Sequence, residues 1–528
     1  VPFYAKVPVA GDIVMKDIDS GYRAFDIAPL MEALEADQMP SPVDVAKVEK
    51  VALDKSMPMA KYYLVHWGSY MTDAKRDIIL EWAKNYRTAY YNDGLAGDRA
   101  GEPIRPIAES LPVDAKKVAL GMALYHDTRL SVDNTVSCAT CHGLNTAGVD
   151  NKQFSVGVDG LKGGVNAPTV YNAVYNFVQF WDGRAVTLAD QAAGPPVNPV
   201  EMASPSFDLI VSKLKKDPKM VRAFRECYPE EGITQATITN AIEEFERTLL
   251  TPNSPFDKYL RGDDTAISEE AKQGYELFKK YNCATCHVGP NLGGESYELM
   301  GLRAHYFADR GLPLTEEDNG RFKQTGVERD RHRFKVPGLR NVALTWPYYH
   351  DGTRESLQEA VCAMGTYQSG VSLTDEEELL IVEFLNSLTG EYQGKPLTNN
   401  NSKLYEHTTS SMNMTNDIDS QIENISSMID NIVSIMENVV AEKTPSEDAV
   451  EGHPIYDDSN RREYIVVYSG AAMMFGNGEG FFVFEKSNGT STRTMEKISE
   501  ELSDNFYENY GKSIFRSGLF LVHHSHIP

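Results

Sequence analysis

Two copies of the motif Cys-x-x-Cys-His constrain the fold of this chain more than any other feature. Both read Cys-Ala-Thr-Cys-His, and they span residues 138–142 and 283–287. In such a motif the two thiols form thioether bonds to the vinyl groups of a haem, and the adjacent histidine is the proximal iron ligand. A zinc site or a redox cysteine pair is the alternative, but neither explains two copies that both carry the histidine. We therefore predict two covalent c-type haems, bound by Cys138, Cys141, His142, Cys283, Cys286 and His287.

The sequence around these motifs is itself repeated. Four residues that follow the first motif recur after the second with identical spacing: Pro168, Asn172, Gly183 and Leu188 correspond to Pro337, Asn341, Gly352 and Leu357. Upstream, Gly121 and Gly274 begin two similar five-residue stretches. Helical periodicity is clear in residues 238–250 and 375–388, whereas strand signals are scarce. The fold is therefore predicted to be mainly α, with two tandem cytochrome c-like domains.

Changes in composition along the chain divide it into five predicted segments. Residues 1–105 form a helical haem-binding module, residues 106–265 the first cytochrome c-like domain and residues 266–397 the second. Residues 398–445 are expected to be a linker and an amphipathic helix, because they open with a polar Asn-rich run. The helix carries an apolar seam with heptad spacing, which fits a coiled coil or a helix packed on its own domain equally well. Residues 446–528 are expected to be a small α+β unit.

The net charge is −25, which argues against nucleic acid and anionic membrane surfaces as partners. The sequence has no apolar run of about 18 residues, the length that a membrane-spanning helix needs. The chain begins at Val1, in what reads as the middle of a domain. We therefore expect further residues upstream, with room for a signal peptide or a membrane anchor.

The residue available as the sixth iron ligand differs between the two repeats. Met364 lies seven residues after Leu357, in a stretch that reads as a loop. Methionine opposite histidine raises the haem potential and suits electron transfer. The matching position, seven residues after Leu188, is Pro195, which cannot bind iron. The first haem is therefore predicted to be open to a small oxygen species, and the nearby Glu201 is a candidate for moving the proton that O–O cleavage requires.

Several stretches between residues 120 and 397 match one family: Gln179-Phe-Trp-Asp-Gly-Arg-Ala185, Phe334-Lys-Val-Pro337 and Pro347-Tyr-Tyr-His350 are the most specific. On these stretches and the haem motifs, the sequence resembles the bacterial dihaem cytochrome c peroxidases of the MauG/CcpA-like superfamily. The resemblance implies that hydrogen peroxide is reduced to two waters at the first haem, with electrons relayed from the second.

The same resemblance implies roles for individual residues. Glu201 corresponds to the distal acid/base, Gln191 to its neighbour in the distal pocket and Trp181 to the electron relay between the haems. Asn166 corresponds to a ligand of a calcium ion that backbone carbonyls near residues 334–337 complete. Arg321 is expected to pair with a haem propionate.

One departure from the family concerns the loop before Asn166. Many members carry a histidine there that blocks the first haem until the second is reduced. Residues 156–165 of this chain contain no histidine, and Val158 lies near the expected position. We therefore expect the first haem to be open at rest.

Residues 1 to about 100 resemble a separate haem-binding module, on the run Val1-Pro-Phe-Tyr-Ala-Lys-Val-Pro8 and a helix over residues 72–84. In that module the Cys-x-x-Cys-His precedes the position of Val1. The chain then resembles the trihaem quinol peroxidases, with a third haem attached upstream. Met57 is the first choice for the sixth ligand of that haem, ahead of Met59 and His66.

Two other functions remain open. A MauG-type enzyme oxidises a protein substrate and carries tyrosine as the ligand of its second haem, which Met364 argues against. A multihaem electron carrier needs six-coordinate iron throughout, which Pro195 and Val158 argue against. For the peroxidase, the expected electron donor is a small redox protein or a quinol, and a homodimer is allowed. The expected location is the periplasm, with a tether to the inner membrane if the upstream residues hold an anchor.

Overall fold

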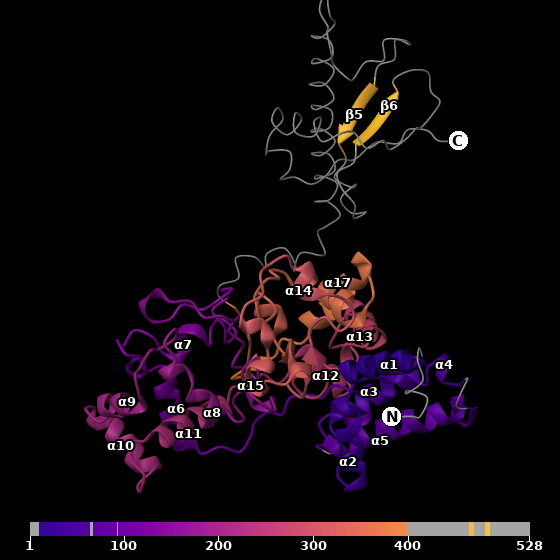
Figure 1. The fold of residues 1–528 in the computed structure, drawn as a ribbon. Helices are drawn as coiled ribbons and strands as arrows, with labels where there is room; N and C mark the ends of the chain where they lie inside the picture. The colour runs from indigo at the N-terminus through magenta and orange to yellow at the C-terminus, as the bar shows by residue number, and fades with distance from the viewer. Residues whose placement is uncertain (1–9, 64–66, 92, 400–463, 469–480, 486–528) are drawn as a thin grey trace, which may run out of the picture. The chain divides into compact units, whose positions relative to one another are not determined.

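The computed structural model describes residues 10–63, 67–91, 93–399, 464–468 and 481–485. Helices dominate, and the strands are few and short, which confirms the mainly α class (Figure 1). The chain divides into two compact units, residues 1–405 and 406–528. In the second unit, β5 (Tyr464–Tyr468) pairs with β6 (Phe481–Glu485) in antiparallel register. The remainder of the predicted C-terminal unit and the predicted helix of residues 398–445 lie outside the described residues.

The N-terminal module is a group of helices, drawn in indigo in Figure 1. Its helices are α1 (Ala10–Ala24), α2 (Ala28–Glu35), α3 (Pro42–Leu53), α4 (Ala60–Tyr63) and α5 (Asp73–Tyr91). Ser41 caps the start of helix α3, because its side chain accepts a hydrogen bond from the Val43 amide. Proline occupies the first helical position. Val45 of α3 is buried against Ala83 and Tyr86 of α5, and this cluster is the core of the module.

The first haem domain is built around two crossing helices, α6 and α11. Its helices are α6 (Ala115–Tyr125), α7 (Cys138–Cys141), α8 (Leu188–Ala192), α9 (Phe207–Leu214), α10 (Pro218–Cys227) and α11 (Gln235–Glu246). Gly121 lies at the crossing, where a side-chain carbon would be 1.8 Å from the carbonyl oxygen of Ala241. Only glycine therefore allows α6 to approach α11 so closely.

The second haem domain repeats this crossing with α13 and α17. Its helices are α12 (Pro255–Leu260), α13 (Glu269–Lys280), α14 (Tyr306–Asp309), α15 (Phe322–Thr325), α16 (Leu357–Met364) and α17 (Asp375–Asn386). Its strands are β1 (Tyr297–Leu299) paired with β2 (Arg333–Lys335), and β3 (Glu391–Tyr392) paired with β4 (Lys395–Pro396), both antiparallel. A carbon at Gly274 would be 1.8 Å from the Leu380 carbonyl oxygen, so the repeated glycine has the same structural cause in both domains.

The two haem domains meet at a buried threonine. Asn172 and Asn341, which occupy the same position in the two repeats, both donate from Nδ2 to Oγ1 of Thr251, over 2.7 Å and 3.0 Å. The Thr251 amide donates back to Oδ1 of Asn172 over 2.9 Å. All three side chains are fully buried. A hydroxyl oxygen accepts two hydrogen bonds, so one residue satisfies both copies of the repeated asparagine.

Within the part of the chain that the structure describes, no helix combines the length and the apolar character that crossing a bilayer demands.

Candidate functional site

The first haem-attachment segment presents a fixed imidazole and two free thiols. Cys138 and Cys141 lie on α7, and neither forms a disulfide. His142 Nδ1 lies 3.2 Å from the carbonyl oxygen of Gly148. Because a carbonyl only accepts hydrogen bonds, Nδ1 carries the proton and Nε2 keeps its lone pair for a metal. Burial lowers the pKa of His142, which favours the neutral ring that binds iron.

The second attachment segment has the same arrangement. Cys283 and Cys286 are free thiols, and His287 Nδ1 lies 2.8 Å from the carbonyl oxygen of Leu292. Burial lowers the pKa of His287 to about 4 and raises that of the Cys283 thiol to about 12. Each segment therefore offers two unpaired thiols beside a neutral imidazole with one open nitrogen, a donor set that fits covalently bound haem c.

Glu201 lies beside the loop in which the expected histidine is replaced. The Val158 amide donates to the Glu201 carbonyl oxygen over 2.8 Å, and the Val158 side chain is buried. Asn198 Nδ2 donates to Glu201 Oε1 over 2.6 Å and fixes the carboxyl. Burial raises the pKa of Glu201, and the Arg184 guanidinium and the Asn198 hydrogen bond oppose that rise. Burial raises the pKa of the Cys138 thiol, and the charges of Glu246 and, more weakly, Glu201 raise it further.

Gly157 allows this loop to contact Glu201, a feature that the sequence reasoning missed. A side-chain carbon at Gly157 would lie 2.3 Å from the carbonyl oxygen of Val200 and 2.4 Å from that of Glu201. These distances are too short for any residue but glycine. Gly157 directly precedes Val158, and this glycine is the one sequence signal that could have pointed to the contact.

Pro195 and Gln191 lie on the segment that leads to Glu201. Gln191 is half-buried on α8, and Pro195 begins a short 3-10 helix three residues after α8 ends. The amide of Met202 donates to the Pro195 carbonyl oxygen over 3.4 Å, which ties this segment to the residue after Glu201. The structure thus brings Gln191, Pro195, Val158 and Glu201 into one region of the first haem domain.

Trp181 lies where the two haem domains meet. Its Nε1 donates to the Asn166 carbonyl oxygen over 2.9 Å, and its own carbonyl oxygen accepts from the Lys335 amide over 2.8 Å. The ring centroids of Trp181 and His350 are 6.3 Å apart. Trp181 therefore contacts both domains at once.

Asn166 is oriented so that its side-chain oxygen stays available. Its Nδ2 donates to the Lys152 carbonyl oxygen over 2.9 Å, and no described residue donates to its Oδ1. Its backbone amide donates to the carbonyl oxygen of His350 over 2.8 Å. Trp181 links Asn166 to Lys335, so the carbonyls near residues 334–337 lie in the same region. One amide oxygen and several carbonyls are a chemically suitable donor set for Ca²⁺.

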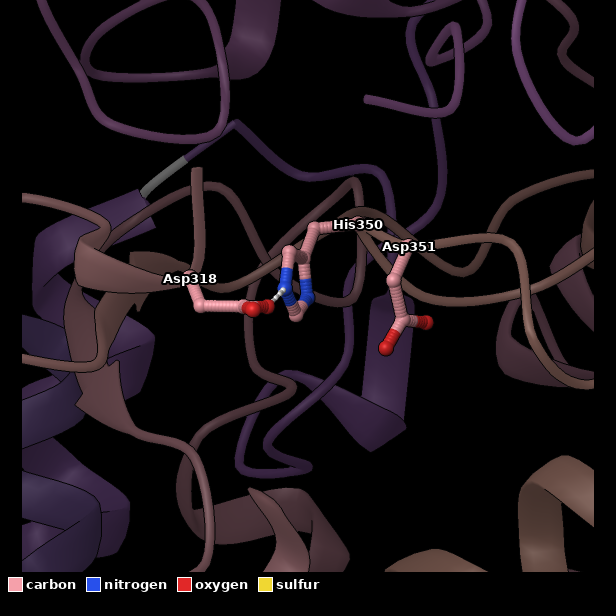
Figure 2. Close-up of side chains that lie close together, drawn as sticks. All are labelled: Asp318, His350 and Asp351. Atoms are coloured by element: carbon pink, nitrogen blue, oxygen red, sulfur yellow. Dashed lines mark hydrogen bonds and ion pairs between the residues drawn. The ribbon is translucent and has the colours of Figure 1, made fainter. Parts of the chain in front are cut away.

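A buried charged cluster lies next to Trp181, and the sequence reasoning did not identify it. Figure 2 shows His350 with Asp318 on one side and Asp351 on the other. His350 Nε2 lies 2.8 Å from Asp318 Oδ1, and the Arg310 guanidinium lies 2.8 Å from Asp318 and 2.7 Å from Asp351. These three side chains resemble a metal site in composition, but Arg310 already supplies the positive charge. The cluster is therefore an ion network in which Arg310 bridges both carboxylates and Asp318 bonds to His350, whose ring centroid lies 6.3 Å from that of Trp181.

Arg321, expected at a haem propionate, already has partners of its own. Its Nε lies 3.4 Å from Asp330 Oδ2, and its guanidinium stacks on the Tyr297 ring at 3.9 Å. Lys335 is different, because its side chain is 5% exposed and no described residue pairs with its amine. Burial lowers the pKa of Lys335 to about 8. A buried amine without an anion is a site for one, so Lys335 joins Arg321 as a candidate for a propionate.

The candidate methionine ligands differ in their surroundings. Met364 is half-buried and is the last residue of α16, so it does not lie in a loop as the sequence suggested. A π-helical turn, Gly365–Ser369, follows it directly. Such turns occur often at functional sites. Met57 is 47% exposed and Met59 is half-buried, whereas His66 lies outside the described residues.

The N-terminal module packs directly onto the second haem-attachment segment. Val43 and Ala46 of α3 form a buried cluster with Val288, the residue after His287. Beside it, Lys47 Nζ lies 2.6 Å from Glu298 Oε1, and both side chains are largely buried. The sequence gave no signal for this contact, because its two sides are more than 200 residues apart in the chain.

Known protein families match both the first haem domain and the N-terminal module. Residues 115–265 match the family described as di-haem cytochrome c peroxidase, and residues 1–85 match the haem-binding domain family. The chain is 49% identical over 394 residues to the cytochrome c peroxidase Ccp of Escherichia coli strain K12, covering 74% of this chain and 84% of that protein.

Two further relatives match the haem domains. The cytochrome c551 peroxidase of Nitrosomonas europaea is 43% identical over 292 residues, covering 55% of this chain and 85% of that protein. The methylamine utilization protein MauG of Methylophilus methylotrophus is 31% identical over 300 residues, covering 54% and 86% respectively.

Proposed function

This chain belongs to the di-haem cytochrome c peroxidase family, and on that premise we propose how its residues reduce hydrogen peroxide to water. The protein is an oxidoreductase with haem c as its cofactor. When bound, the haem on His142 supplies the iron at which peroxide is reduced, and the haem on His287 supplies the centre that takes electrons from a donor. The observation that supports the proposal is the hydrogen bond between the Val158 amide and the Glu201 carbonyl oxygen, since it joins half-buried Glu201 to the loop that lacks the family's histidine.

Glu201 is proposed to move the proton. Reduction of hydrogen peroxide to two waters takes up two electrons and two protons, and the O–O bond breaks more easily when a proton is delivered to the departing oxygen, which then leaves as water. Burial raises the pKa of Glu201, so its carboxyl keeps a proton to higher pH than an exposed glutamate does. The hydrogen bond from Asn198 keeps one carboxyl oxygen in place and leaves the other free for the proton.

Val158 and Pro195 are proposed to keep the peroxide side of the first site open. Neither side chain has a lone pair that binds iron. We propose that no protein ligand has to leave before peroxide enters, so the oxidised enzyme reacts without prior reduction. Gln191, on the same segment, is proposed to line the pocket.

Trp181 is proposed as the path between the domains, and Met364 as the sixth ligand on the side of electron entry. Trp181 bonds to Asn166 of the first domain and to Lys335 of the second, which supports that role. Asn166 and the carbonyls near residues 334–337 are proposed to hold calcium, which would fix the same boundary.

The N-terminal module is proposed to be the entry point for electrons. Helix α3 covers Val288, next to His287, so a redox centre in the module would lie close to the second haem-attachment segment. This supports a third haem attached upstream of Val1, with Met57 or Met59 as its ligand. We propose the periplasm as the location and a quinol or a small redox protein as the donor, of which the module favours the quinol.

Replacing Glu201 by Gln tests the proposed role. Glutamine keeps the shape and the hydrogen bond from Asn198 but cannot carry the proton, so peroxide turnover should fall on the order of 10²- to 10⁴-fold. Absorbance spectra should show that both haems remain bound. Glu231→Gln, an exposed position in the same domain, is the matched control. Full activity in Glu201→Gln would remove this residue from the mechanism.

A further inference from the structure

Four oxidisable side chains form a continuous row along helix α5. The ring centroids are 6.0 Å apart from Trp82 to Tyr86, 5.4 Å from Tyr86 to Tyr90 and 5.0 Å from Tyr90 to Tyr91. The spacing of four residues places Trp82, Tyr86 and Tyr90 on one face of the helix. Electron transfer between side chains falls steeply with distance, so rings in contact exchange electrons more readily than isolated ones.

The inner end of the row reaches the second haem-attachment segment. Gly289 follows His287 by two residues, and a side-chain carbon built on it would lie 3.1 Å from the hydroxyl oxygen of Tyr91. Gly289 is held in place, because its amide donates to the Pro103 carbonyl oxygen over 2.9 Å and its own carbonyl oxygen accepts from the Arg105 amide over 3.2 Å. Tyr91 therefore contacts the backbone that follows the iron-binding histidine.

The Glu295 carboxyl lies beside the Tyr91 hydroxyl and is positioned to accept its proton. The same carbon at Gly289 would lie 2.0 Å from Glu295 Oε1, so this carboxyl and the Tyr91 hydroxyl crowd one glycine. The hydroxyl makes no hydrogen bond of good geometry in the described part of the chain. Burial raises the pKa of Glu295 to about 7, and the neighbouring Tyr91 hydroxyl partly opposes that rise. Tyrosine loses its phenolic proton when it is oxidised, so a neighbouring base makes that oxidation easier.

The row reaches solvent at Tyr90. Tyr86 is 7% exposed, whereas Tyr90 is 41% exposed. The hydroxyl of Tyr86 donates to the Pro40 carbonyl oxygen. A proton lost from Tyr90 can pass directly to water. The row therefore connects a half-buried tyrosine, whose hydroxyl is enclosed near Gly289, to a solvent-exposed ring.

We infer that Tyr91 and Tyr90 supply the electrons for peroxide reduction when the donor is absent, and so carry oxidising equivalents out of the second haem domain to the surface. Two tyrosines each lose one electron and one proton, and one peroxide becomes two waters: H₂O₂ + 2 TyrOH → 2 TyrO• + 2 H₂O. Tyr91 passes its proton to Glu295, and Tyr90 passes its proton to solvent. Hydrogen peroxide is the oxidant, so the inference rests on the peroxidase activity and needs no other reagent.

Electron paramagnetic resonance of the fully oxidised holoenzyme tests this inference. The protein is mixed with hydrogen peroxide without donor and frozen, once with ordinary and once with ring-deuterated tyrosine. We expect an organic radical whose signal narrows on deuteration and falls several-fold in Tyr91→Phe and in Glu295→Gln. Tyr22→Phe, an exposed tyrosine on α1, should leave the signal unchanged.

Donor-driven turnover separates this inference from the proposed function. Tyr91→Phe should reduce peroxide at the normal rate with donor present, but its haem absorbance should bleach after fewer additions of peroxide without donor. If Tyr91→Phe and Tyr90→Phe both turn over normally with donor and keep the full radical signal, the inference is wrong. The second variant carries the test should Tyr91→Phe fold poorly, because Tyr90 is an exposed position.

Discussion

The backbone amide of Val158 donates a 2.8 Å hydrogen bond to the carbonyl oxygen of Glu201. The residue near the position of the family's histidine and the residue proposed to move protons are therefore joined through the main chain. A side chain introduced at position 158 would therefore lie in the surroundings of Glu201. This makes position 158 the most direct place to test whether the first haem is open.

Val158→His is expected to close the first haem. The oxidised wild-type holoenzyme should show a high-spin component from an iron with an open position, and the variant should show a second low-spin haem instead. Peroxide reduction by the variant should then require prior reduction. Val186→His, at an exposed position of the same domain, should leave the spectrum unchanged. A purely low-spin wild-type spectrum, with both haems six-coordinate, would contradict the open site.

Gly157→Ala should displace Glu201. The new carbon would lie 2.3–2.4 Å from two carbonyl oxygens, so the loop or residues 200–201 must move. We expect a loss of about 1–3 kcal/mol in the free energy of unfolding and a clear fall in turnover. Gly163→Ala in the same loop meets only an ordinary 3.8 Å contact and serves as the control. Equal activity of the two variants would show that the contact does not position Glu201.

Met364→His should lower the midpoint potential of the second haem. Histidine keeps the iron six-coordinate, but it replaces the thioether that raises the potential. Potentiometric titration of the holoenzyme should show one haem shifted to lower potential and the other unchanged. Met122→His, at an exposed position on α6, should shift neither. An unchanged potential for both haems in the Met364 variant would exclude this methionine as a ligand.

Thr251→Val should destabilise both haem domains together. The change keeps the shape but leaves the buried Nδ2 groups of Asn172 and Asn341 without their acceptor. Each unsatisfied donor costs about 1–3 kcal/mol. Urea denaturation should therefore show a large loss in the free energy of unfolding. Thr88→Val removes an exposed hydroxyl that donates only within its own helix, α5, so this variant should lose far less free energy of unfolding.

Stability should fall as pH rises, through Glu246. Burial raises the pKa of this carboxyl from 4.5 to about 8. The folded protein therefore holds the proton where the unfolded chain releases it. The contribution is complete below the unfolded pKa and is lost as pH rises through the folded pKa, so stability should drop by up to a few kcal/mol from about pH 5 to about pH 8.

Glu246→Gln should remove that dependence, because glutamine does not titrate. Glu230→Gln, at an exposed position, should retain it. Urea denaturation of the holoprotein at both pH values measures the difference. Identical pH dependence in wild type and Glu246→Gln would assign the effect to other groups.

The sequence predicted what the repeat and the motifs encode locally. The tandem haem domains, the helices near residues 238–250 and 375–388, and the equivalence of Gly121 and Gly274 all follow from spacing along the chain. It did not predict the pairing of Arg310 with Asp318 and Asp351, or the contact between α3 and Val288. Those contacts join segments whose residue types look like ordinary surface charges and ordinary apolar positions until the fold brings them together.

The meeting of both repeats at Thr251 has a consequence for the history of the molecule. Two copies of one ancestral unit usually remain separable, since each brings its own complete set of bonds. Here the hydroxyl of Thr251 accepts a hydrogen bond from each copy, and Thr251 lies in the segment between them. A single substitution at Thr251 therefore removes the acceptor of both copies. Selection at this one position therefore acts on both repeats at once.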